Sequence, residues 1–191
     1  MKRAACSIAL TVLLTGFAAV RRQQQVQAPQ IVTLPGALQR TYSSIKADLT
    51  QAAEKMPEAD FAFKPTPDVR SFAQLFTHVA ASNFGACAAV KGETNPNQDK
   101  SIEQKFSKAD VMKALAESFT YCDSVFSTLT QEGLSQMITS GPNQFARGWP
   151  ITHTLEHGSE MYGIATVYLR LKGIVPPSTE RELQFRRPAG K

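Results

Sequence analysis

The residues most capable of chemistry in this sequence are its three histidines, His78, His153 and His157. His153 and His157 are four residues apart, so on a helix their side chains lie on one face, one turn from each other. Two imidazoles at this spacing can bind one divalent metal ion. The alternative is that each histidine is an ordinary core or boundary residue, and the spacing alone leaves both interpretations open.

The histidine pair is expected to point inward. Counting 100° per residue places Glu160 and Met161 on the same side of the helix, in a stripe that continues through apolar residues to Leu171. His78 lies beside an apolar stripe of an earlier predicted helix, so it can face the same interior. Glu160, one turn from His157, is a candidate general base or a group that orients a metal ligand. Its alternative is a polar residue at a boundary position.

Four helical segments are predicted to carry these residues. In the first, over residues 34–56, apolar residues recur at spacings of three and four, which is typical of a helix with one buried face. The second begins at Ser71 with a capping-box pattern, and the third begins at Ser107. The fourth begins at Pro150 and ends at Gly173. Because no segment alternates as a strand does, the predicted fold is an all-α four-helix bundle.

The long connection over residues 91–106 affects the topology, because it can cross from one end of the bundle to the other. The second and third helices could therefore run in the same direction. Cys87, 16 residues after Ser71, and Cys122, 15 residues after Ser107, would then lie at nearly equal heights and could form a disulfide. An antiparallel pair would separate the thiols by about 18 Å or more along the axis. Equal height does not require the bond, since Cys122 could stay a buried free thiol.

The beginning of the chain has the features of an export signal. A positively charged start precedes an uncharged stretch over residues 4–20, which is shorter than the roughly 20 residues of a spanning helix. We predict a signal peptide and flexible segment over residues 1–28, a bundle domain over residues 29–180 and a loose tail over residues 181–191. Export would place the protein in the periplasm or outside the cell, and an uncleaved membrane anchor is the alternative.

The charge balance does not favour a nucleic-acid partner. The chain has 21 basic and 16 acidic residues, but four basic residues precede residue 28, which leaves 17 against 16 and a charge of +1. No glycine-rich phosphate loop, nucleophile elbow or paired-cysteine zinc motif is present in the sequence. The expected partner is a small-molecule substrate. Contact with a membrane is expected only through an uncleaved signal segment, and a homodimer stays open.

Several segments resemble the DinB-like family, whose members are regarded as metalloenzymes. The resemblance is carried by residues 71–80 (SFAQLFTHVA), 153–163 (HTLEHGSEMYG) and 168–177 (YLRLKGIVPP), with residues 56–67 similar to the first connector of the family. It implies a four-helix bundle in up-down-down-up order. It also implies one histidine on the second helix and a pair on the fourth, which bind a divalent metal ion such as zinc or nickel. Some relatives are thiol-dependent S-transferases, and many have no established activity.

The sequence departs from the family's ligand set at one position. His78 and His157 match family ligands, but Met161 occupies the third position, and a thioether is a weak ligand for zinc or nickel. His153 could replace it, or the site is degenerate and holds no metal. The predicted function is an exported, divalent-metal-dependent hydrolase or thiol-dependent transferase acting on a small molecule, with Glu160 as catalytic residue. The alternative is a non-catalytic exported bundle that binds a small molecule or a partner.

Overall fold

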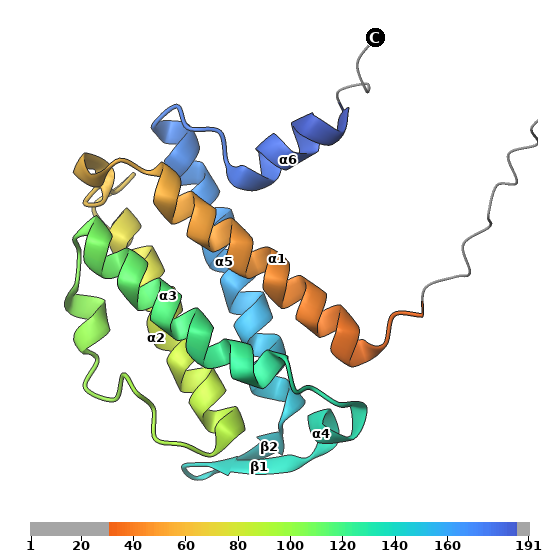
Figure 1. The fold of residues 1–191 in the computed structure, drawn as a ribbon. Helices are drawn as coiled ribbons and strands as arrows, with labels where there is room; N and C mark the ends of the chain where they lie inside the picture. The colour runs from red at the N-terminus through yellow and green to blue at the C-terminus, as the bar shows by residue number, and fades with distance from the viewer. Residues whose placement is uncertain (1–30, 187–191) are drawn as a thin grey trace, which may run out of the picture. The chain divides into compact units, whose positions relative to one another are not determined.

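The computed structural model describes residues 31–186, and the predicted signal segment lies outside this range. Its long helices are α1 (Leu34–Lys55), α2 (Phe72–Lys91), α3 (Lys108–Phe126) and α5 (Gly148–Leu171). Its shorter elements are η1 (Glu58–Asp60), η2 (Ser101–Gln104), α4 (Gln131–Ser135), β1 (Met137–Ser140), β2 (Asn143–Ala146) and α6 (Pro177–Arg186). The long helices lie side by side in Figure 1, which confirms the prediction of a mainly helical bundle.

Side-chain caps begin three of the long helices at the predicted places. The hydroxyl oxygen of Ser71 accepts from the Gln74 backbone N–H at 3.2 Å, and Gln74 Oε1 accepts from the Ser71 N–H at 2.8 Å. Thr33 and Ser107 cap α1 and α3 through their hydroxyl oxygens. Each cap binds an N–H group that has no partner within its helix, which determines where the helix starts. α5 has no side-chain cap and begins at Gly148, two residues before the predicted start.

α2 and α3 run in the same direction. Asn83 Nδ2 donates to Ser118 Oγ at 3.2 Å, and one turn further along both helices Cys87 and Cys122 form a disulfide with their Cα atoms 5.5 Å apart. Both contacts join residues 35 positions apart. Because the separation stays constant along the pair, the two helices run parallel. The predicted parallel pairing of these two helices and the predicted disulfide are therefore confirmed.

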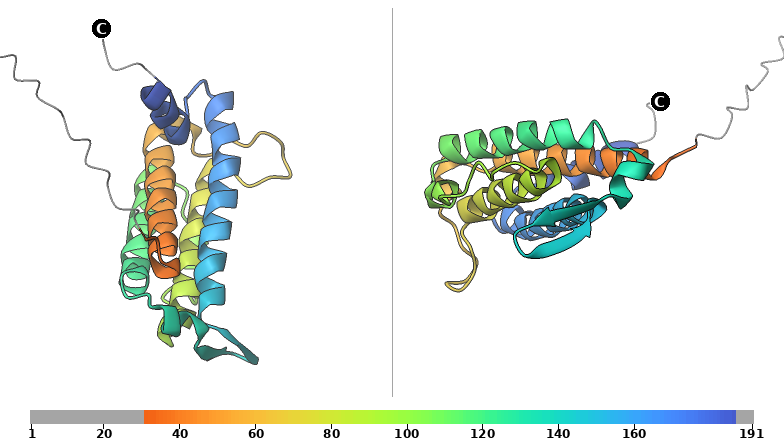
Figure 2. Two further views of the ribbon diagram at one scale, coloured as in Figure 1. Left: turned by 90° about the vertical axis from the view of Figure 1, so that its right-hand side faces the viewer. Right: turned by 90° about the horizontal axis from the view of Figure 1, so that it is seen from below.

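The core of the bundle receives side chains from all four long helices. Leu49, Phe76, Leu115 and Ile151, one from each helix, are each buried almost completely. α1 packs against α3 and α5, while α2 packs against α3 and α5. α5 approaches α1 closely at Gly158, where an added Cβ would lie 2.7 Å from a methyl group of α1. The packing thus leaves α2 and α5 in direct contact along their lengths (Figure 2).

The segment between α3 and α5 contains two strands, which the sequence analysis did not predict. It contains the antiparallel hairpin β1–β2, in which Ser140 pairs with Asn143 around a turn at Gly141. The all-α prediction is therefore wrong for these strands. Each strand has only four residues and lies mostly exposed, so its sequence carries no alternation long enough to indicate a strand.

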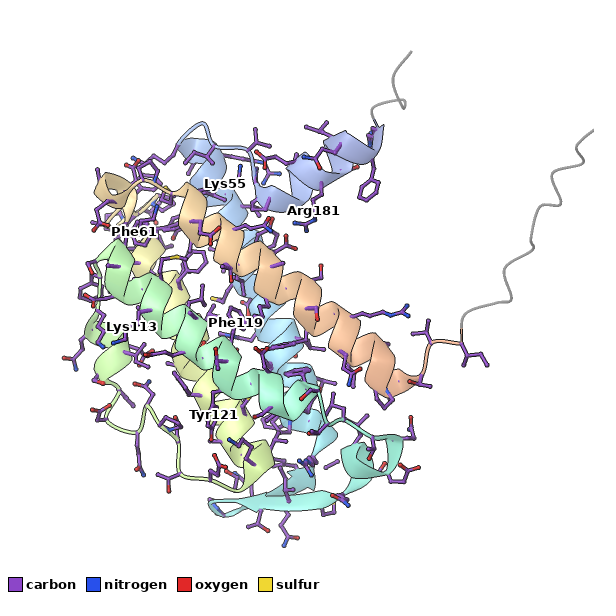
Figure 3. All side chains as sticks on the ribbon, in the orientation of Figure 1. Lys55, Phe61, Lys113, Phe119, Tyr121 and Arg181 are labelled. Carbon is purple, nitrogen blue, oxygen red and sulfur yellow. A yellow bond between two sulfur atoms is a disulfide. The ribbon has the colours of Figure 1, made fainter. Side chains whose placement is uncertain are left out.

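The prediction of a loose C-terminal tail is also wrong for residues 181–186. They belong to α6, which lies against α1 at the end of the bundle opposite the hairpin (Figure 2). Arg181 forms an ion pair with Asp48, and Lys55 forms one with Glu180; Figure 3 labels both cations. These contacts with α1 hold a segment that is rich in charged residues. The rest of the predicted tail lies outside the described residues.

Candidate functional site: a histidine cluster between two helices

The three histidines meet between α2 and α5. The ring centroids of His78, on α2, and His157, on α5, lie 4.9 Å apart. The ring centroid of His153, one turn before His157, lies 5.8 Å from that of His157. All three side chains are partly buried. The structure therefore brings every predicted metal-ligating histidine into one group, which we call the histidine cluster.

The antiparallel packing of α2 and α5 positions this cluster. Phe72 at the start of α2 lies near Tyr168 toward the end of α5, with ring centroids 6.3 Å apart. Ala86, near the other end of α2, borders the same cavity as Trp149 at the start of α5. Residues near the middle of the two helices, such as His78, therefore face each other across the contact.

Glu103, on η2, supplies a carboxylate to the cluster. Its Oε1 lies 3.3 Å from Nδ1 of His78. A proton on Nδ1 can donate to this carboxylate, which orients the ring and leaves a lone pair on Nε2. The buried side chain of Asn97 accepts from the backbone N–H of Ile102 and so holds the turn that carries Glu103. Glu103 was not predicted from the sequence. It lies in the connection between α2 and α3, where no helical periodicity indicates which way a side chain points.

His157 is uncharged at neutral pH. Its pKa is lowered from 6.5 to about 4, mainly because the ring is buried, and the neighbouring His78, His153 and Arg70 contribute to this lowering as potential like charges. An uncharged imidazole keeps one nitrogen lone pair, with which it can accept a hydrogen bond or coordinate a cation. Arg70, which precedes the cap of α2, is a second contributor to the site that was not predicted from the sequence.

The cluster does not fit a three-ligand metal centre as its side chains lie. Within residues 31–186, no three His, Cys, Asp or Glu side chains are arranged to hold a metal ion together. His153 is stacked on Trp149, with ring centroids 5.6 Å apart and planes 7° apart. Met161, at the position of the missing family ligand, is buried with 5% exposure. The cluster therefore offers two close imidazoles, at His78 and His157, while the third imidazole is stacked on Trp149 and the Glu103 carboxylate contacts Nδ1 of His78.

Glu160 lies outside the contacts of the cluster. Its side chain is exposed, and it takes part in no hydrogen bond or ion pair within the part of the chain that the structure describes. On a helix it is turned about 60° from His157, which directs it toward solvent here. Its role as a general base stays a prediction, while the carboxylate that contacts a histidine belongs to Glu103.

A cavity of about 600 Å³ adjoins the cluster at His153. It lies between α2, the β1–β2 hairpin and the first turn of α5. Trp149 lines it with 57% of its surface exposed. Arg147, two residues earlier, borders a separate, smaller cavity beside α4.

A second cavity, of about 670 Å³, lies further along the same pair of helices. Leu75, Ile164 and Tyr168 give it apolar walls, and Arg70 and Asp68 bring charges to it. The two cavities and the histidine cluster between them follow the contact of α2 with α5, and we call this region the α2–α5 site.

A helical bundle with histidines between its second and last long helices defines the class of protein as DinB-like. A family model described as the DinB superfamily matches residues 41–163, and the chain belongs to this superfamily. The match includes all three histidines and Glu103. It therefore covers the bundle from within α1 through most of α5.

Three solved structures share this fold. A DinB-like protein from Bacillus cereus ATCC 10987 is 12% identical, with a TM-score of 0.62, and the alignment covers 78% of this chain and 98% of that one. A DinB-like protein from Bacillus subtilis is 19% identical, with a TM-score of 0.58 and coverage of 72% and 92%. A conserved protein from Enterococcus faecalis is 16% identical, with a TM-score of 0.60 and coverage of 74% and 98%. A comparison with curated proteins gives no match.

Proposed function

We propose that this protein binds a small molecule at the α2–α5 site and that the histidine cluster contacts the bound molecule. The observation that carries the proposal is that His153 belongs both to the cluster and to the wall of the 600 Å³ cavity. Small-molecule sites are concave, largely apolar and furnished with a few polar groups. A cavity that ends at a group of imidazoles has these properties, and binding at it requires no metal ion.

The cluster gives such a molecule well-defined hydrogen-bonding groups. His157 is neutral at physiological pH, because its pKa is about 4, and so offers one donor and one acceptor nitrogen. His78 is oriented by the carboxylate of Glu103, which favours an accepting Nε2. A ligand that reaches from the cavity to the cluster would therefore meet imidazole nitrogens that can donate or accept hydrogen bonds.

A fragment screen observed by protein NMR tests the proposal. Fragments should shift the amide signals of α2 and α5 around the cavity, and His153→Ala should weaken their binding about ten-fold or more. Glu156→Ala is the matched control, since Glu156 is an exposed residue of the same helix. Fragments that bind only away from α2 and α5, or that bind the His153→Ala variant as well as the wild type, would overturn the proposal.

A divalent-metal-dependent hydrolase or thiol-dependent transferase is the second candidate function, and one contact favours it. Histidine ligands of metals commonly donate their other ring N–H to a carboxylate, as His78 can donate to Glu103. His78 and His157 also occupy positions that match family ligands. A bound zinc or nickel ion would act as a Lewis acid and lower the pKa of bound water. The shortage of a third donor is why this candidate comes second.

Calorimetric titration of the metal-free protein with Zn²⁺ or Ni²⁺ separates the two candidates. If the cluster is a metal centre, alanine at His78 or His157 should abolish binding and alanine at His153 should weaken it. Met161→His should raise the affinity about ten-fold or more, because it restores an imidazole one turn from His157. Glu160→Ala should leave metal affinity unchanged and lower only activity. Failure of both the wild type and Met161→His to bind either metal would refute this candidate and leave small-molecule binding standing.

We also propose that the protein is exported and that its bundle has up-down-down-up order. The Cys87–Cys122 disulfide supports export, because such bonds persist mainly in oxidising compartments. In residues 31–186 no helix is long and apolar enough to cross a membrane. The antiparallel contact of α2 with α5 and the parallel contact of α2 with α3 support the order of the helices. Mass spectrometry of the protein from its native host tests export, and an intact Met1-to-Lys191 chain in the cytoplasm would contradict it.

A further inference from the structure

We propose that the 600 Å³ cavity binds an uncharged, flat aromatic or heteroaromatic molecule, stacked against the exposed ring of Trp149. The inference rests on the proposed function, since it names the class of ligand that one part of the α2–α5 site takes. It is carried by three properties of the cavity: an aromatic wall, a floor of small side chains, and a lining without charged residues.

The aromatic wall consists of three rings in a row from two different elements. Phe145 of β2 lies 5.0 Å from Trp149, centroid to centroid, and Trp149 is stacked on His153 at 5.6 Å with the ring planes 7° apart. All three residues line the cavity. Trp149 nonetheless keeps 57% of its surface exposed, although large aromatic side chains are usually well buried. The wall therefore offers an aromatic surface that its own neighbours do not cover, on which a flat aromatic ring can stack in an offset arrangement.

The floor of the cavity comes from α2. Ser82, Gly85, Ala86 and Ala89 line it at positions i, i+3, i+4 and i+7 of one helix face. None of these side chains is larger than that of serine, so they do not fill the space between α2 and the aromatic wall. A cavity bounded by a helix face of small residues on one side and by rings on the other suits a flat molecule.

The hairpin and its turn bring uncharged polar groups to the cavity. Ser140, Asn143 and Gln144 of the hairpin and its turn supply hydroxyl and amide groups, and none of the described lining residues is Lys, Arg, Asp or Glu. A charged ligand would lose hydration here without gaining an opposite charge, which is unfavourable. A neutral ligand can satisfy its hydrogen bonds with the amides. The second cavity, which includes Arg70, differs in this respect, so charge distinguishes the two ends of the α2–α5 site.

The test uses three related probes and one reporter. Trp149 is the only tryptophan of the chain, so the indole N–H gives a single, unambiguous NMR signal at the cavity. The probe 2-naphthamide is flat and neutral, 2-naphthoate has the same rings with a negative charge, and cyclohexanecarboxamide has the amide without a flat ring. We expect 2-naphthamide to shift the indole signal saturably, and each of the other two to bind at least about ten-fold more weakly.

A matched pair of variants assigns the binding to the cavity. Ala86→Leu should fill the floor and weaken 2-naphthamide about ten-fold or more. Ala116→Leu makes the same change at an exposed position of α3 that does not line the cavity, and it should leave binding unchanged. Because the comparison of the three probes uses the wild-type protein alone, it decides the question even if Ala86→Leu fails to fold.

The outcomes separate this inference from the proposed function. Equal or tighter binding of 2-naphthoate or cyclohexanecarboxamide at the indole would overturn the ligand class and would leave small-molecule binding at the α2–α5 site in place. Shifts confined to the second cavity, around Tyr168, would overturn the assignment to this cavity with the same consequence. Absence of any indole shift with all three probes would overturn the inference. The proposed function is refuted by a different result, namely that no fragment of the screen shifts the amide signals of α2 or α5.

Discussion

Acid should destabilise this protein through the imidazole of His157. The pKa of this group is about 4 in the folded protein and about 6.5 in an unfolded chain. Since the unfolded chain binds the proton more tightly, the contribution to stability is fully present above about pH 6.5 and is lost as the pH falls toward 4. The main cause is burial of the ring at the α2–α5 contact, where an imidazolium would lose hydration.

The magnitude follows from the two pKa values. At about pH 5 the unfolded imidazole is almost fully protonated and the folded one almost fully neutral, so the free energy of unfolding should fall by about 2 kcal/mol relative to neutral pH. The limiting loss, below about pH 4, is about 3 kcal/mol, from 1.4 kcal/mol for each pKa unit. With a urea m-value of about 2 kcal/mol/M, the loss at pH 5 corresponds to a midpoint shift of about 1 M.

Urea unfolding of the metal-free protein at about pH 7.5 and about pH 5 measures this effect. The wild type should lose about 2 kcal/mol more than His157→Gln, whose side chain does not titrate in this range. His78 and His153 are present in both proteins, so the difference between them reports mainly on His157. An NMR titration of the ring C–H signals gives the pKa directly. Equal acid sensitivity of the two proteins, or a His157 pKa near 6.5, would refute the argument that burial keeps this ring neutral.

Two further perturbations test the packing around the site. Reducing the Cys87–Cys122 bond, which joins residues 35 positions apart, should lower the free energy of unfolding by about 4 kcal/mol. Urea unfolding with and without reductant measures this, and an unchanged midpoint would contradict it. Gly158→Ala should lose about 1–3 kcal/mol in thermal unfolding, because its Cβ would lie 2.7 Å from Ile45 Cγ2. Gly163→Ala, on the same helix with open space around the new Cβ, should instead gain about 0.5–1 kcal/mol.

The long helices could be predicted because their signals are local. Ser71 and Ser107 stand at the caps, and the apolar spacing that follows each cap identifies the buried face. The disulfide depends also on the relative direction of α2 and α3. Counting residues from each cap showed that a parallel pair would place the two cysteines at nearly equal heights. The hairpin and α6 carry no comparable local signal. Arg181 holds α6 to Asp48, 133 residues earlier, and such a contact cannot be read from either segment alone.

The candidate site was predictable to a similar degree. Helical spacing placed His153 and His157 on one face, and the resemblance to the family added His78 on another helix. Glu103 could not be placed, because its position depends on how a long connection folds back over α2. The stack of His153 on Trp149 could not be predicted either, since the sequence does not indicate what the exposed ring of Trp149, in the first turn of α5, will contact.

The order of residues along α5 supports the proposal that a small molecule, rather than a metal ion, binds at this site. Trp149, His153, His157 and Met161 follow one another at intervals of four residues, so they form a row that turns by about 40° at each step, from the exposed Trp149 to the buried Met161. The ligand pair of the family would occupy positions 157 and 161, beside His78. In this chain the imidazoles occupy positions 153 and 157, one turn nearer the aromatic cavity, and a buried thioether takes the inner place. A molecule in the cavity can therefore reach an imidazole directly, while a metal ion beside His78 would have one imidazole fewer to bind it.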